Sequence, residues 1–211
     1  MHKISTLEKE ELVSEALKNA ISYAEYRVLV SKHAESFTST GHTQTESLSN
    51  YTILNDRRMK RWDKVFKLSG DFINQLVFNS QPINWIVLTE SWCGDAAHTM
   101  PIMNKIAEQV ENLNFKVALR DDNPQLMDAF LTNGAMSIPK LIAQDPITGK
   151  ILGSWGPRPS IATKMVADYK KEYGTLTPNF KEDLQLWYNK DKGENTAQDL
   201  VVFLKENHQN F

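Results

Sequence analysis

The sequence predicts an α/β fold with a central mixed β-sheet of at least four strands, flanked by helices. The first observation is a short, continuous apolar run with β-branched residues at 85–88, which is typical of a buried central strand. The second is the order of strand-like and helix-like segments that follows it. The third is a hairpin pattern over 137–155. Further helical segments precede and follow this region.

The N-terminal segment, residues 1–80, is predicted to be a helical extension. Ser5 and Glu8 have the spacing of a capping box, and apolar residues then recur at helical intervals as far as Val30. This pattern predicts one amphipathic helix. The polar segment 36–47 ends it, and a second helical stretch follows.

Residues 81–176 are predicted to form the α/β domain. The strand at 85–88 leads directly into a helix that contains Pro101, a residue that predicts a kink. The alternation over 115–119 predicts a second strand. A short helix is expected to begin at Asn123 and to close near residue 134.

The second half of this domain is predicted to be a hairpin that turns at 145–149, followed by a covering helix over 158–174. We expect the helices to cover one face or edge of the sheet. Residues 177–211 are predicted to be a helical tail that packs on the core and takes no part in chemistry. Its expected docking residues are apolar or aromatic: Leu184, Trp187, Tyr188, Leu200, Val201, Phe203 and Leu204.

Composition indicates an ordinary globular protein. The chain has 211 residues, is 41% hydrophobic, and carries 24 basic and 26 acidic residues for a net charge of −2. That balance provides no broad attraction to nucleic acid or membrane. The local basic run over 55–64 is interrupted by Asp56 and Asp63, and we interpret it as a solvated helix face. The acidic N-terminus resembles neither a secretory signal nor a membrane span, so we expect a cytoplasmic protein.

Cys93 is the single cysteine. One cysteine excludes an internal disulfide and an all-cysteine zinc site, and leaves a buried inert thiol, an intermolecular link or a reactive thiol. Because Cys93 falls between a buried strand and a helix, its sulfur is expected at a helix N-terminus, where the macrodipole favours a thiolate. The Asp95 carboxylate should repel that thiolate. We therefore expect a lowered pKa, though less lowered than the dipole alone would give.

The motif Trp92-Cys93-Gly94 after an apolar strand, Pro101 eight residues beyond the cysteine, and Ile138-Pro139 about 45 residues after it resemble the thioredoxin superfamily. The resemblance covers about residues 83–173 and implies a thioredoxin-like fold. It also implies a cis bond before the proline and a catalytic Cys93 with Asp95 nearby. By the same resemblance, a surface that binds an extended substrate is formed by Trp92, Gly94, Ile138, Pro139 and Gly156.

Two positions depart from the pattern of thioredoxins. Ala96 stands where a second, resolving cysteine is usual, and Val87 stands where thioredoxins keep a buried acid. An internal thiol therefore cannot release an attacked substrate. By analogy with monothiol relatives, we predict thiol–disulfide exchange through mixed disulfides with a protein or small-thiol substrate, resolved by an external thiol such as glutathione.

Other interpretations remain open at this point. The chain could be a redox-inactive thioredoxin-fold module that binds a peptide or protein through the groove at Ile138. Asp95 is either a proton-transfer group or a capping carboxylate, and Lys140 either stabilises a thiolate or is a solvated charge. Trp92 packs in the core or shapes the rim of the site. His98 should lie off the face of Cys93, which argues against a Cys–His dyad.

We expect no resident cofactor and no metal site, with glutathione or another small thiol as co-substrate only. The cysteine, aspartate and histidine near residue 93 lack the spacing of zinc ligands. An iron–sulfur cluster shared between two chains, as in some monothiol glutaredoxins, is the remaining alternative.

Overall fold

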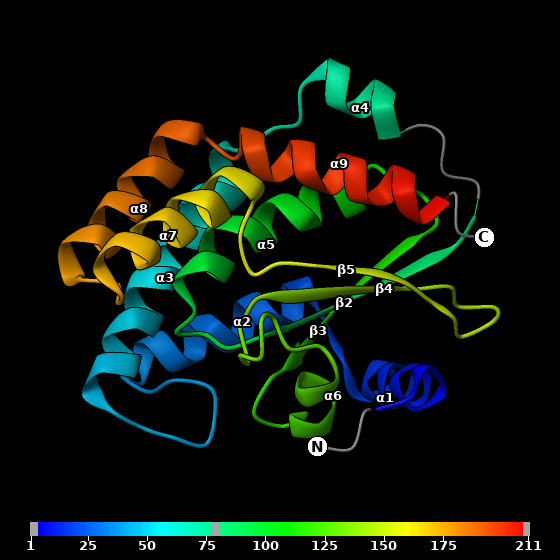
Figure 1. Cartoon of the computed structure of the whole chain (residues 1–211), viewed down its shortest axis with the longest axis horizontal. Helices are drawn as coiled ribbons and strands as arrows, with labels where there is room; N and C mark the ends of the chain where they lie inside the picture. The colour runs from blue at the N-terminus through cyan, green and yellow to red at the C-terminus, as the bar shows by residue number, and fades with distance from the viewer. Residues whose placement is uncertain (1–3, 77–80, 209–211) are drawn as a thin grey trace.

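A computed structural model describes residues 4–76 and 81–208 (Figure 1). Parts of the predicted segments 1–80 and 177–211 therefore lie outside the described residues. The elements are α1 (Thr6–Asn19), β1 (Ile21–Ser22), α2 (Tyr23–Glu35), α3 (Glu46–Val65), α4 (Gly70–Leu76), β2 (Ile83–Thr89), α5 (Gly94–Ala107), β3 (Leu113–Leu119), α6 (Pro124–Ala129), β4 (Lys140–Gln144), β5 (Ile151–Trp155), α7 (Ser160–Tyr173), α8 (Pro178–Asp191) and α9 (Glu194–His208).

Five strands form one mixed sheet in the order β1-β3-β2-β4-β5. The central strand β2 pairs parallel with β3 and antiparallel with β4, while β5 and β1 pair antiparallel at the two edges. This arrangement confirms the predicted α/β class with a mixed sheet. The buried strand, the helix after it, the second strand and the hairpin all form where the sequence places them.

The N-terminal region differs from its prediction. The Ser5 capping box is present, with the Glu8 N–H donating to the Ser5 hydroxyl oxygen at 3.2 Å. However, the single helix predicted as far as Val30 is wrong, because the chain leaves the helix at Ala20 and adds β1 to the edge of β3. Ser22 then begins α2 with a second capping box. The pattern Ser-x-x-Glu at 22–25 was the available signal for this break.

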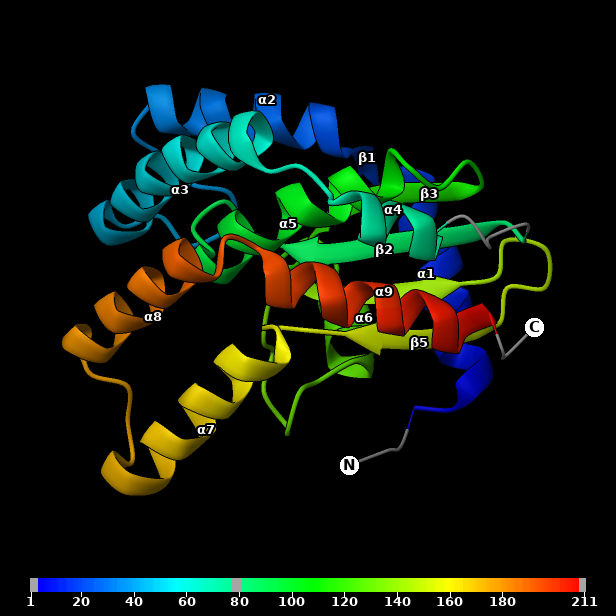
Figure 2. The same ribbon diagram turned by 90° about the horizontal axis from the view of Figure 1, so that it is seen from above.

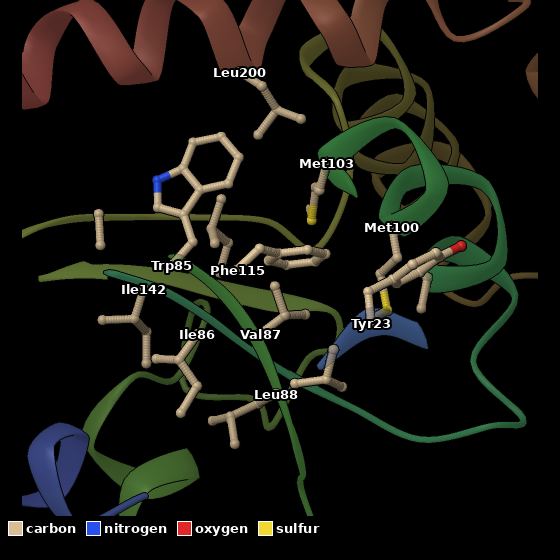
Figure 3. Close-up of a cluster of buried hydrophobic side chains, with 14 of the residues drawn as sticks. Tyr23, Trp85, Ile86, Val87, Leu88, Met100, Met103, Phe115, Ile142 and Leu200 are labelled. Atoms are coloured by element: carbon tan, nitrogen blue, oxygen red, sulfur yellow. The ribbon is translucent and has the colours of Figure 1, made fainter. Parts of the chain in front are cut away.

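The core lies on both faces of the sheet. Because side chains alternate along a strand, Trp85 and Val87 point from β2 toward α5 and α9, whereas Ile86 and Leu88 point to the opposite face (Figure 3). All four are completely buried. Figure 1 shows α5 and α9 over one face and α1 and α6 over the other. Helices therefore cover both faces, and the expectation that they cover one face or edge of the sheet is wrong.

The C-terminal helices fall into two groups. Helix α9 contacts α5 and β5, and buries Leu200 and Val201 completely. Helices α7 and α8 form a separate small cluster that includes Phe180 and Leu184. In Figure 1 and Figure 2, α3, α7 and α8 gather at the same end of the sheet. That end carries the candidate site.

Two smaller points complete the fold. The short helix α6 ends at Ala129, before the predicted closure near residue 134, and an isolated bridge joins Thr132 to Ala135. Among the described helices, none has the length and apolar composition needed to cross a membrane.

Candidate functional site

Cys93 lies between the end of β2 and the start of α5, where it is the N-cap residue of the helix. Its sulfur accepts a hydrogen bond from the Ala96 N–H at 3.4 Å. The thiol also donates to the Ile138 carbonyl oxygen at 3.2 Å. The side chain therefore links the helix start to the segment before β4, and the residue is only 7% exposed.

The environment of this thiol opposes ionisation. Burial raises the pKa of Cys93 to about 12, and the neighbouring Asp95 carboxylate adds to the effect. The Ala96 N–H and the Arg158 guanidinium lower the pKa, but by less than burial raises it. The expectation of a lowered pKa is therefore wrong, because desolvation outweighs the helix dipole. At neutral pH the side chain is a neutral thiol.

Asp95 joins three parts of the molecule. Its Oδ1 accepts a hydrogen bond from the Tyr188 hydroxyl of α8 at 2.9 Å. Its Oδ2 forms an ion pair with Arg158, which precedes α7, at 2.7 Å. Burial raises the pKa of Asp95, and both partners offset part of that rise. Both carboxylate oxygens are thus engaged in holding α8 and the β5–α7 connection against α5, and the N-cap position belongs to Cys93.

His98 of α5 is held by three neighbours from α3 and α8. The Trp62 Nε1–H can only donate, so His98 Nδ1 accepts at 3.0 Å, and Nε2 donates to the Gln185 amide oxygen at 2.7 Å. The imidazole stacks on Tyr188, with centroids 4.4 Å apart and planes 2° apart. Burial lowers the pKa of His98 to about 4. None of these contacts involves Cys93. The neutral imidazole instead helps to pack α3 and α8 against α5.

The segment before β4 meets the β5–α7 connection by close backbone contact. The Ile138–Pro139 and Gly156–Pro157 peptide bonds are both cis. Gly156 has φ +113°, and a Cβ at this residue would lie 2.3 Å from the Pro139 carbonyl oxygen. Only glycine fits this contact, so Gly156 allows the β5–α7 connection to pack directly against the backbone of Pro139.

The loop before Cys93 is fastened to the N-terminal region through Ser91. The Thr40 N–H donates to the Ser91 hydroxyl at 2.9 Å, and the Ser91 N–H donates to the Thr40 hydroxyl at 2.7 Å. Thr52 and Asn55 of α3 bind the Ser91 hydroxyl and carbonyl oxygens at 2.8 and 2.9 Å. These hydrogen bonds join Ser91 both to α3 and to the segment before it.

Glu90 adds a buried carboxylate to this fastening. It accepts hydrogen bonds from the Thr40 hydroxyl and, at 2.9 Å, from the Asp121 N–H. Burial raises the pKa of Glu90. Within the described part of the chain, Glu90 forms no ion pair.

A cavity of about 770 Å³ lies beside Cys93 and is bounded by α3, α5, α8 and the loops before β4 and α7. Its lining residues are Leu48, Tyr51, Arg58, Trp92, Cys93, Gly94, Asp95, Arg120, Met136, Ser137, Ile138, Pro157, Arg158, Leu176, Pro178, Lys181, Glu182, Leu184 and Gln185. Five of the predicted site residues therefore line this cavity: Trp92, Cys93, Gly94, Asp95 and Ile138. Pro139 and Gly156 lie outside the lining set, as does Lys140, a buried residue of β4.

The lining of the cavity is rich in basic residues. Arg120 forms an ion pair with Asp121 at 2.7 Å and lies over the Trp92 ring, 4.9 Å from its centroid. Trp92 therefore lines the cavity in cation–π contact with Arg120 and also packs, partly buried, against the hydrophobic core. Arg58 and Lys181 also line the cavity. With Arg158, the lining contains four cations, and its carboxylates are Asp95 and Glu182.

Sequence reasoning missed the contributions of α3 and α8. Arg58 was interpreted as part of a solvated face, although it shares helical spacing with Asn55 and the buried Trp62. Gln185 and Tyr188 have the same relation on α8, and they bind His98 and Asp95. Spacings of three and four residues were the available signal. They define a face, but they do not say what packs against it.

No group of three or more histidine, cysteine, aspartate or glutamate side chains in residues 4–76 and 81–208 is arranged to hold a metal ion.

Comparison with known proteins identifies the family. The model of a thioredoxin family matches residues 41–170, more than half of the chain. The chain belongs to the thioredoxin family. None of the curated proteins matches it. The matched region of this thioredoxin-family chain begins before α3, so it includes the helix that holds Ser91 and Arg58.

Two solved structures share the fold. One is a protein of unknown function from Pseudomonas aeruginosa, with 14% identity, a TM-score of 0.54, and coverage of 72% of this chain and 84% of that one. The other is an HIV epitope-scaffold, also with 14% identity, a TM-score of 0.53, and coverage of 88% and 98%. At this identity the likeness concerns the fold alone.

Proposed function

We propose that this thioredoxin-family protein is a binding module that holds an extended peptide segment of a partner in the cavity beside Cys93. The observation that carries the proposal is the contrast between a buried, neutral thiol and the accessible cavity next to it. The Cys93 thiol already donates a hydrogen bond to the Ile138 carbonyl oxygen. The cavity volume of about 770 Å³ is within the range of ligand-binding sites.

The cavity wall suits an extended peptide. Ile138 lies outside the strands, and in the described residues its N–H donates no backbone hydrogen bond. An extended segment alongside it would find a main-chain donor, as in strand addition. Tyr51 and Met136 line the same cavity and are 44% and 54% exposed, so they offer apolar contact to side chains of the bound segment.

Monothiol exchange is the second candidate, and the position of Cys93 on the cavity wall favours it. The thiolate would attack one sulfur of a bound disulfide, forming a mixed disulfide and releasing the other sulfur as a thiolate. An external thiol such as glutathione would then attack the mixed disulfide and release Cys93. With a pKa of about 12, however, only about one molecule in 10⁵ carries the thiolate at pH 7.

The pH dependence of Cys93 alkylation by iodoacetamide separates the two candidates. The binding module predicts slow alkylation that rises only above about pH 10, and no mixed disulfide after incubation with glutathione disulfide at pH 7, as measured by mass spectrometry. The urea-unfolded chain is the control and should show a midpoint near pH 8.5. A folded-state midpoint below about 8.5, together with a glutathione adduct, would instead establish the exchange reaction.

A further inference from the structure

Two cations of the cavity lining form no ion pair with a carboxylate of the described residues, although the Asp95 charge acts on Arg58 from beyond ion-pair distance. Arg58 of α3 donates to the Asn55 amide oxygen at 3.0 Å, and Lys181 projects from α8. Neither forms an ion pair within 4.0 Å of any described carboxylate, whereas the other two lining arginines are both paired. Because Asp121 pairs with Arg120 and Asp95 pairs with Arg158, Arg58 and Lys181 against Glu182 leave an excess of one positive charge at the lining.

The Arg58 guanidinium lies beside the start of α5, next to Cys93. Its Nη1 lies 3.7 Å from the position that a Cβ on Gly94 would occupy, so the guanidinium lies over the first residue of α5. The helix N-terminus also favours negative charge. The guanidinium is half-buried and bonded to a neutral amide, and burial lowers its pKa. A carboxylate would restore the favourable electrostatics that burial removes.

Apolar surface lies close to these cations. Tyr51 is on the same helix as Arg58, and Met136 precedes Ile138 across the cavity. Leu48 and Leu176 add partly buried apolar contacts. The cavity lining therefore combines apolar side chains, some of them exposed, with cations that lack an ion pair, which is complementary to a segment that carries both apolar and acidic side chains.

We propose that the occupant of this cavity is an acidic peptide segment, with apolar side chains against Tyr51 and Met136 and an aspartate or glutamate carboxylate bound by Arg58 and Lys181. This inference rests on the proposed peptide-binding function and specifies its ligand. Arginine is suited to the carboxylate because its planar guanidinium can donate two parallel hydrogen bonds. Lys181 contributes a second, more exposed charge.

Selection from a random heptapeptide phage library against the full chain tests this. Recovered peptides should contain aspartate or glutamate several-fold more often than the input library, beside apolar residues. A recovered peptide is then synthesised in acidic form and with glutamine in place of its acids. Fluorescence anisotropy at low salt should show about tenfold tighter binding of the acidic form, and added salt should reduce the difference.

Variants locate the charge effect. The double variant Arg58→Gln/Lys181→Gln should remove most of the preference for the acidic peptide while still binding the glutamine form. Lys170→Gln/Lys171→Gln removes two charges from the last turn of α7, outside the cavity lining, and should keep the preference. Circular dichroism melting checks that both double variants fold. A preference that persists in Arg58→Gln/Lys181→Gln overturns the inference.

The outcomes also separate the inference from the function beneath it. Peptides that are enriched without acidic bias would overturn the inference and leave peptide binding supported. Absence of any enriched peptide would overturn both. If free succinate displaced the acidic peptide at concentrations similar to those of the peptide itself, a small dicarboxylate would be the ligand, and the peptide proposal would be wrong.

Discussion

Two buried carboxylates lie on either side of Cys93, and they are satisfied in different ways. Glu90, before the cysteine, accepts hydrogen bonds from a hydroxyl and a backbone N–H and has no ion pair within the described residues. Asp95, after it, binds the Tyr188 hydroxyl and forms an ion pair with Arg158. Of these two carboxylates, only Asp95 lines the cavity.

The difference shows how the site is built. On the Glu90 side, neutral hydrogen bonds close the loop against the region before α3. On the Asp95 side, an ion pair holds the β5–α7 connection, and the hydrogen bond and ring stack of Tyr188 hold α8 beside an accessible cavity. The loop of Cys93 is thus held from both sides by segments that the sequence assigned to extensions. The boundaries at 1–80, 81–176 and 177–211 remain a proposal, but the site draws on all three.

The largest expected effect is on the Asp95 side, from Tyr188→Ala. It removes the stack on His98 and the hydrogen bond to Asp95, and should lower the free energy of unfolding by about 3–5 kcal/mol in urea titrations at pH 7. Tyr188→Phe keeps the ring and should cost only about 1 kcal/mol. The exposed Tyr173→Ala is the control, with an expected change within about 0.5 kcal/mol. Equal effects of the three changes would refute this account of α8 packing.

The next effect is a pH dependence from His98. Its pKa is lowered to about 4 in the folded state from 6.5, so between these values the unfolded chain binds the proton more strongly and stability falls as pH falls. The full shift corresponds to about 3 kcal/mol between pH 7 and 4. The raised pKa values of Glu90 and Asp95 act with the opposite sign, because their protonation favours the folded state.

The difference between the native chain and His98→Gln isolates this contribution. The free energy of unfolding of each protein is measured by urea titration at several pH values. Between pH 7 and 4 it should fall more steeply for the native chain than for His98→Gln. NMR titration of His98 gives its pKa directly, and a midpoint near 6.5 would contradict the buried neutral ring.

A smaller effect compares the carboxylates themselves. Asp95→Asn leaves Arg158 without its counter-charge and should cost about 2 kcal/mol, because breaking a partly buried ion pair strands one charge. Glu90→Gln leaves no charge stranded and should cost less than about 1 kcal/mol. Both are measured by urea unfolding at pH 7. A larger cost for Glu90→Gln would reverse the comparison.

Much of the fold was predictable because its signals are local. The apolar run of β2, the alternation of β3 and the hairpin turn each specify their element within a few residues. The break at Ala20–Ser22 was missed because apolar residues keep helical spacing across it. Only pairing with β3, about 95 residues later in the chain, makes Ile21 and Ser22 a strand.

The site was predictable only in part, for the same physical reason. The resemblance of the motif at 92–94 and of Ile138-Pro139 indicated which residues meet, and Cys93 does contact Ile138. The burial of the thiol depends on distant packing, and neither the Asp95–Tyr188 contact nor the Arg58 position can be inferred from spacing near residue 93. The direction of the pKa shift follows from that burial, which is why a dipole argument gave the opposite sign.

The capping role of residue 93 has a consequence for any experiment that removes its sulfur. Serine is among the best residues at this helix position, and its hydroxyl can accept from one backbone group and donate to another as the thiol does. Exchange of one sulfur atom for oxygen should therefore leave the architecture intact. The fold should therefore not depend on the Cys93 sulfur atom. A Cys93→Ser variant thus tests whether the function needs a thiol, without a loss of stability that would obscure the result.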